Sequence, residues 1–111
     1  MCHFFVYVTT SSELEAINLG RTAVEERLAA CANVLGKCKS IYWWENSLRT
    51  DNENTLILKT VSEKLDHLIN RLKQIHSYEC PCIVALKIQQ GNVEFLDWIS
   101  RETSQNFKME K

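Results

Sequence analysis

The side chains best suited to bind a metal ion lie close together near residue 80. They are His76, Glu79, Cys80 and Cys82. Imidazole and thiolate groups suit copper or zinc, and cysteines at alternate positions of an expected strand point to one face. The spacing differs from the paired Cys-x₂₋₄-Cys of most four-ligand zinc sites. The segment is therefore a candidate metal site, but weak adventitious binding of thiophilic ions is favoured over a specific site, and packing of the cysteines as small hydrophobic side chains is a further alternative.

The other cysteines have simpler interpretations. Cys31 ends an alanine-rich helical pattern, where a small apolar side chain packs well. Cys2 and His3 are metal ligands by type, but a frayed terminus is favoured there. Five cysteines at irregular spacing fit reduced thiols better than a disulfide framework. A redox role for the pair near residue 80 is a further alternative.

The composition is that of one globular domain of 111 residues, with 45% hydrophobic and 24% charged residues. A formal charge of −1 argues against a dedicated nucleic-acid or anionic-membrane binder, which carries a basic face. No apolar run approaches the roughly 20 residues that span a bilayer, which argues against membrane insertion. The first residues also lack a signal-peptide pattern, so a cytoplasmic location is expected.

The apolar periodicity predicts alternating strands and helices. Strands are expected at residues 3–10, 33–44, 54–60 and 82–90, and helices at residues 11–32, 62–77 and 91–103. Ser12 and Glu15 have the spacing of a capping box, and Ser62 and Asn92 are expected N-caps. Gly36 predicts a bulge in the second strand. Residues 45–53 are polar and predict the turn of a long hairpin.

This order, βαββαβ with an added C-terminal helix, predicts an α+β, ferredoxin-like fold with a four-stranded antiparallel sheet and both main helices on one face. We expect one domain over residues 1–111, with a loose tail at about 104–111. The strands are apolar on both faces, since Phe4 and Val6 alternate with Phe5 and Tyr7. A solvated face would alternate with polar residues. Another copy of the chain is the simplest cover for the second face.

Three aromatic residues in a row lie before the hairpin turn. On a strand, Tyr42 and Trp44 share one face and Trp43 takes the other. Large apolar patches mark interfaces, so we predict that the three rings join subunits. The alternative is that the hairpin curls and its rings cover each other. Glu45 and Asn46 would then begin the turn.

Five blocks of the sequence, ERLAACANV, IYWWEN, LILKT, HSYECP and FLDWI, resemble the CutA family of divalent-cation tolerance proteins over about residues 4–103. The resemblance implies a ferredoxin-like homotrimer with PII-like architecture, in which hairpin strands join neighbouring subunits. It also implies a link to tolerance of copper and other divalent metals and, for animal members, to anchoring of acetylcholinesterase. No reaction is established for the family, so we predict no enzyme, no organic cofactor, and Cu²⁺ or another divalent cation as ligand.

The resemblance also implies a ligand cleft. Lys59, Tyr78 and Glu79 match family positions that line clefts between subunits, and Trp44 and Glu45 lie in the matching hairpin block. A lysine and a carboxylate at such a rim could orient a small ligand or could pair across the interface. The structural pair is slightly favoured.

The sequence departs from the family pattern at several positions. Ser77 and Cys82 replace a Pro and a Glu of the fifth block, and Asn46 replaces the Gly after YWWE. A copper site associated with bacterial members uses one Cys and a His pair. The corresponding positions here are Val8, Ile75 and His76. Since one ligand of three is kept, the resemblance does not carry that site over whole.

Other functions on the same fold lack their motifs. Acylphosphatases need a phosphate-cradling loop with an Arg after the first strand, heavy-metal chaperones need Met-x-Cys-x-x-Cys there, and RNA-recognition domains need aromatic residues with basic neighbours. We therefore predict a non-enzymatic homotrimer that responds to divalent metals and binds copper or a similar cation. The alternative is a PII-like small-ligand signalling or protein-anchoring trimer without a physiological metal.

Overall fold

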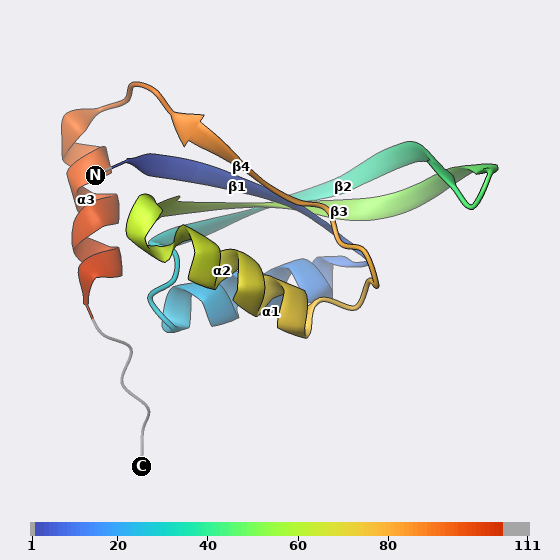
Figure 1. The fold of residues 1–111 in the computed structure, drawn as a ribbon, viewed down its shortest axis with the longest axis horizontal. Helices are drawn as coiled ribbons and strands as arrows, with labels where there is room; N and C mark the ends of the chain where they lie inside the picture. The colour runs from blue at the N-terminus through green and yellow to red at the C-terminus, as the bar shows by residue number, and fades with distance from the viewer. Residues whose placement is uncertain (1, 106–111) are drawn as a thin grey trace, which may run out of the picture.

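The computed structural model describes residues 2–105. Its elements are β1 (His3–Thr10), α1 (Glu13–Glu25), β2 (Cys31–Trp44), β3 (Ser47–Val61), α2 (Ser62–Ile75), β4 (Ile83–Ile88) and α3 (Val93–Ser104). The strands form an antiparallel sheet in the order β2-β3-β1-β4. Helices α1 and α2 cover one face, and α3 lies across the end of the sheet where β1 begins (Figure 1). This is the α+β, ferredoxin-like arrangement that the sequence predicts.

The core lies between the sheet and its two covering helices. Alternate residues of the central strands point toward the helices, so Val6 lies opposite Leu58 and Val8 opposite Leu56, all fully buried. The helices add the buried side chains of Ala16, Leu19, Ala23, Leu68 and Leu72. Burying a side chain of leucine size stabilises a fold by about 1.5–3 kcal/mol. This cluster therefore fixes how the sheet sits on the helices.

The start of α1 is the predicted capping box with one change. The Ser12 hydroxyl accepts a hydrogen bond from the Glu15 backbone N–H at 3.1 Å. The Glu15 carboxylate accepts from the backbone N–H of Ser11, at 2.9 Å, rather than from that of Ser12. The helix start therefore depends on both side chains.

The end of α1 was predicted too late in the sequence. The helix ends at Glu25, because Arg27 adopts a left-handed φ of 61°. The N–H of Leu28 then donates to the carbonyl of Ala23 at 2.9 Å, and the N–H of Arg27 donates to the carbonyl of Val24 at 3.1 Å, as in a Schellman motif. Cys31 consequently begins β2 instead of ending a helix.

The β2–β3 hairpin is longer and its turn tighter than predicted. Glu45 and Asn46 form a two-residue turn with φ values of 49° and 62°, the left-handed values of a type I′ turn. The prediction of a turn over 45–53 was wrong, because β3 already begins at Ser47. The bulge near Gly36, which has φ 101°, is confirmed. The far half of the hairpin projects beyond both covering helices (Figure 1).

Smaller differences concern the second half of the chain. Helix α2 starts at Ser62 itself, so Val61 takes the N-cap position and no side chain caps the helix. The Asn92 cap of α3 is confirmed, since its side chain accepts from the Glu94 N–H at 3.1 Å. Strand β4 covers Ile83–Ile88 and is shorter than predicted. Of the predicted tail, Ser104 belongs to α3, and residues 106–111 lie outside the described residues.

The sheet face opposite α1 and α2 is apolar and exposed, as the strand pattern predicts. Phe5 lies opposite Leu86, and Tyr7 opposite Val84, on β1 and β4. The side chains of Phe5, Val84 and Leu86 are exposed to solvent in the single chain. Coverage of this face by another copy remains a prediction. Among the described helices, none is long and apolar enough to cross a bilayer.

Candidate functional site

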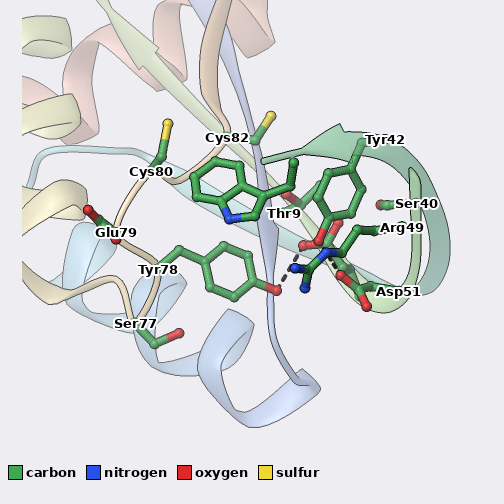
Figure 2. A pocket seen from close by; sticks show the side chains of 12 residues that line it. Thr9, Ser40, Tyr42, Arg49, Asp51, Ser77, Tyr78, Glu79, Cys80 and Cys82 are labelled. Carbon is green, nitrogen blue, oxygen red and sulfur yellow. Dashed lines mark hydrogen bonds between the residues drawn. The ribbon is translucent and has the colours of Figure 1, made fainter. Parts of the chain in front are cut away.

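A cavity of about 660 Å³ lies at the root of the projecting hairpin, beside the loop between α2 and β4 (Figure 2). The hairpin lines it with Ser40, Tyr42, Trp44, Arg49, Asp51 and Glu53. Thr9 closes it from β1, and residues 77–80 and 82 close it from the loop. Tyr42 and Trp44 thus share one face of the hairpin, as predicted. Trp43 lies on the other face and does not line the cavity.

The loop is fastened to the end of β1 through a buried histidine. The Nε2–H of His76 donates to the carbonyl of Thr9 at 2.8 Å, and Nδ1 accepts from the backbone N–H of Tyr78 at 3.1 Å. A second tie runs from the N–H of Thr9 to the carbonyl of Cys82, at 3.4 Å. Both ring nitrogens of His76 therefore have a structural role.

Glu15 holds the start of the same loop. Its carboxylate accepts from the backbone N–H of Ser77 at 2.8 Å, in addition to its bonds to Ser11. Burial alone would raise the pKa of Glu15, but these hydrogen bonds outweigh burial and lower the pKa to about 2. The ionised carboxylate thus links the start of α1 to the cavity loop.

Two tyrosine–carboxylate pairs line the cavity (Figure 2). The hydroxyl of Tyr78 donates to Glu53 at 2.8 Å, and that of Tyr42 donates to Asp51. Burial, and then the bond to Glu53, raise the pKa of Tyr78 well above its usual value. The bond to Asp51 raises the pKa of Tyr42. Both hydroxyls therefore remain protonated and act as donors.

Sequence reasoning missed the polar residues that β3 contributes to this cavity. Arg49, Asp51 and Glu53 fall inside the segment that was expected to be a turn. Their alternate spacing was the available signal, because residues i, i+2 and i+4 of a strand share one face. A tight two-residue turn at Glu45 and Asn46 would have placed all three on that face.

The cleft implied by the resemblance lies between subunits, and within one chain only some of its predicted residues lie together. Trp44, Tyr78 and Glu79 line the cavity, whereas Lys59 and Glu45 do not. Glu45 lies in the hairpin turn. The five residues are therefore not gathered at one place within a single chain.

Lys59 lies on the open face of the sheet instead. Its ammonium donates to the Asn33 side-chain oxygen at 2.6 Å and lies 5.7 and 5.6 Å from the ring centres of Phe5 and Phe95. These contacts are of the cation–π type. The side chain therefore supports the open face and the start of α3.

The four predicted metal ligands do not form a four-ligand site within one chain. Over residues 2–105, no three His, Cys, Asp or Glu side chains gather as a metal site would require. The ring of His76 is already bonded at both nitrogens. Glu79, Cys80 and Cys82 are exposed and line the cavity. The two cysteines precede β4 and so do not alternate on a strand as predicted.

The residues at the bacterial-type copper positions do not fit a copper ion either. Val8 is fully buried in the core and Ile75 packs against it, and neither side chain has a ligand atom. All five cysteines are free thiols. Of the four predicted ligands, Glu79, Cys80 and Cys82 are the ones that are exposed beside the cavity.

The chain matches known proteins along most of its length. The family model described as "CutA1 divalent ion tolerance protein" matches residues 4–102. The divalent-cation tolerance protein CutA of Archaeoglobus fulgidus is 42% identical over 87% of this chain and 94% of its own length. The chloroplastic protein CutA 1 of rice, Oryza sativa, is 38% identical over 91% of this chain, which spans 57% of the rice protein.

Solved structures agree with this relationship. The structure described as the periplasmic divalent cation tolerance protein CutA from Archaeoglobus fulgidus superposes with a TM-score of 0.88 at 40% identity, covering 91% of this chain and 98% of that one. The names of these relatives place one in the chloroplast and one in the periplasm. The cytoplasmic location expected for this chain therefore stays a prediction. By sequence and by structure, the chain belongs to the CutA1 divalent ion tolerance family.

Proposed function

We propose that the protein acts without catalysis, as a homotrimer that binds copper or a similar cation and so contributes to divalent-ion tolerance. Membership of the CutA1 family supports the tolerance role. The observation that supports the proposed trimer is a pair of apolar surfaces that are exposed in a single chain. The cation is proposed to bind in the cavity at the root of the hairpin.

The first apolar surface is the outer face of the projecting hairpin, formed by Ile41, Trp43 and Leu48. Their exposed fractions are 68%, 71% and 62%, and Trp43 lies directly opposite Leu48. The second is the open sheet face with Phe5 and Leu86. Two different surfaces that cover one another make a head-to-tail contact, which forms a closed ring when the rotation between neighbouring subunits returns to the first one. A ring of three is the number that the family resemblance implies.

The cavity supports cation binding through its charge. Asp51, Glu53 and Glu79 line it, against the single guanidinium of Arg49. Carboxylate oxygens and the thiols of the loop are ligand types that divalent metals accept. Because the β2–β3 hairpin lines the cavity, a bound cation would contact the same hairpin that is proposed to contact the neighbouring subunit.

A second candidate is a PII-like trimer that binds a small organic ligand. Tyr42, Trp44 and Tyr78 give the cavity aromatic walls, and aromatic walls with a few polar groups are typical of small-ligand sites. In this case the metal would have no physiological role. The two candidate functions differ in the ligand that fills the cavity, which is a divalent cation in the first and a small organic molecule in the second.

Calorimetric titration of the intact chain with Cu²⁺, Zn²⁺ and nucleotides tests both candidates. The proposal expects saturable heat with Cu²⁺ and a weaker response to nucleotides. A matched pair of variants is Glu79→Gln in the cavity and Glu94→Gln at the start of α3, of which only the first should lower the Cu²⁺ affinity. Saturable heat with nucleotides alone would favour the second candidate, and no saturable heat with any divalent ion would refute the first.

A further inference from the structure

We propose that Cys80 and Cys82 form a two-thiolate site for reduced copper, Cu(I), on the loop between α2 and β4. The inference deepens the proposed function and rests on it in one respect, namely that the protein takes up copper. The inference differs from the proposed function in the oxidation state of the bound copper and in the residues that bind it. The bound ion would be the soft, monovalent form, held by sulfur alone.

The two thiols are placed for joint binding. They flank Pro81, both are exposed, and both line the cavity. In Figure 2 their sulfur atoms point the same way, away from Tyr78. Two residues that flank a single residue are at most about 7 Å apart at Cα. Two metal–sulfur bonds of about 2.3 Å need the sulfurs about 4.6 Å apart, which rotation of the two side chains can reach.

The segment that carries the thiols is held in place before any ion binds. Pro81 fixes its own φ and disfavours a helical conformation at Cys80. The carbonyl of Cys82 accepts from the N–H of Thr9 at 3.4 Å, and His76 ties the other end of the loop to the same residue at 2.8 Å. Ligands that are already ordered lose less entropy on binding.

The number of available ligands selects the ion. Zinc sites normally take four protein ligands, or three with water, whereas no three candidate ligands cluster within residues 2–105. The nearby imidazole of His76 is bonded at both nitrogens. Thiolates are soft ligands that select Cu(I), and two of them complete its linear coordination.

The two cysteines of β2 do not offer this geometry. Cys31 and Cys38 are seven residues apart on β2, about 23 Å along a strand. The sulfur of Cys38 already accepts a hydrogen bond from the Thr55 hydroxyl at 3.1 Å. Cys31 is partly exposed and free, so Cys31→Ser is a matched control for the loss of one thiol.

The test is a competition for Cu(I) under anaerobic, reducing conditions, with bicinchoninate as the colorimetric competitor. The intact chain should bind one Cu(I) per subunit. Cys80→Ser and Cys82→Ser should each weaken binding by about 100-fold or more, because each removes half of the coordination, while Cys31→Ser should leave it unchanged. Circular dichroism checks that each variant is folded. X-ray absorption of the copper-loaded wild type should show two sulfur neighbours.

Three results would overturn the site: equal Cu(I) affinity in Cys80→Ser and wild type, an equal loss in Cys31→Ser, or a spectrum dominated by nitrogen and oxygen neighbours. Failure of the proposed function gives a different result. A monomer without Cu²⁺ heat that still binds Cu(I) through both cysteines would refute the trimer and the divalent-cation proposal and leave the Cu(I) site standing. A trimer that gives saturable heat with Cu²⁺, and whose Cu(I) affinity is unchanged in Cys80→Ser and Cys82→Ser, would refute the Cu(I) site and leave the proposed function standing.

Discussion

The two halves of the β2–β3 hairpin have the same strands and the same pairing but opposite surroundings. Leu58, in the near half, is fully buried beneath the helices, whereas Leu48, ten positions earlier on the same face of β3, is 62% exposed. The near half completes a core within one chain. The far half carries exposed apolar side chains, Ile41, Trp43 and Leu48 among them, beyond the reach of α1 and α2 (Figure 1).

This contrast shows that strand composition and strand burial are separate properties. A strand pattern says which residues share a face, and it does not say what covers that face. In the near half the cover is a helix of the same chain. In the far half we propose that it is another subunit, which separates residues needed for folding from residues needed for assembly.

The largest expected effect comes from the near half. Leu58→Ala should lower the free energy of unfolding by about 3 kcal/mol, since it opens a cavity in a fully buried cluster. Urea denaturation at several protein concentrations measures it. Leu48→Ala is the matched control. Its loss should be largest at high protein concentration and should shrink at dilutions where the chains are single, because Leu48 is exposed in a single chain. Equal, concentration-independent losses in both variants would contradict the contrast.

The next effect concerns the far half. Trp43→Ala should weaken assembly by about 2 kcal/mol or more, the size of an interface hot spot, while the chain keeps its circular dichroism spectrum. Light scattering over a dilution series gives the dissociation constant. Trp44→Ala, at 39% exposure and beside the cavity, should weaken assembly less. A stronger effect at Trp44 would place the subunit contact on the cavity face.

A smaller effect is expected where the two halves meet. Tyr78→Phe removes the donor to the buried Glu53 and should cost about 1 kcal/mol, because the carboxylate loses its partner. Adding Glu53→Gln completes a double-mutant cycle in unfolding free energy. Strictly additive losses would mean that the hydrogen bond contributes nothing to joining the loop and the hairpin.

The smallest effect is a dependence on pH at the loop. The pKa of Glu15 is about 2 in the folded chain and about 4.3 when unfolded, so its ionised form stabilises the fold. This contribution is complete above about pH 4.3 and is lost as the pH falls toward 2. Glu15→Gln should cost about 1 kcal/mol at pH 6, a figure reduced for partial solvent screening. A difference from wild type that stays constant down to pH 2 would contradict this assignment.

The fold was largely predictable because its signals are local or periodic. The capping pair Ser12 and Glu15, the Asn92 cap and the bulge at Gly36 are all found where the sequence places them. The end of α1 was not predictable in this way, because Arg27 occupies a left-handed position that usually belongs to glycine.

The candidate site was less predictable, because it depends on distant contacts. Polar residues of β3 appeared to form a turn until the tight turn at residues 45–46 placed Asp51 and Glu53 on a strand. His76 looked like a metal ligand by type, and only its bonds to Thr9 and Tyr78 show its structural role. Residue type suggests chemistry, but burial and partners decide which groups are available.

The mass of the protein in solution tests the central claim most directly. If the far half of the hairpin is covered by another copy, native mass spectrometry should give three times the chain mass of 12.9 kDa, and Trp43→Ala should shift the population toward single chains. A mass of one chain at all concentrations, with Trp43 still exposed, would contradict the account.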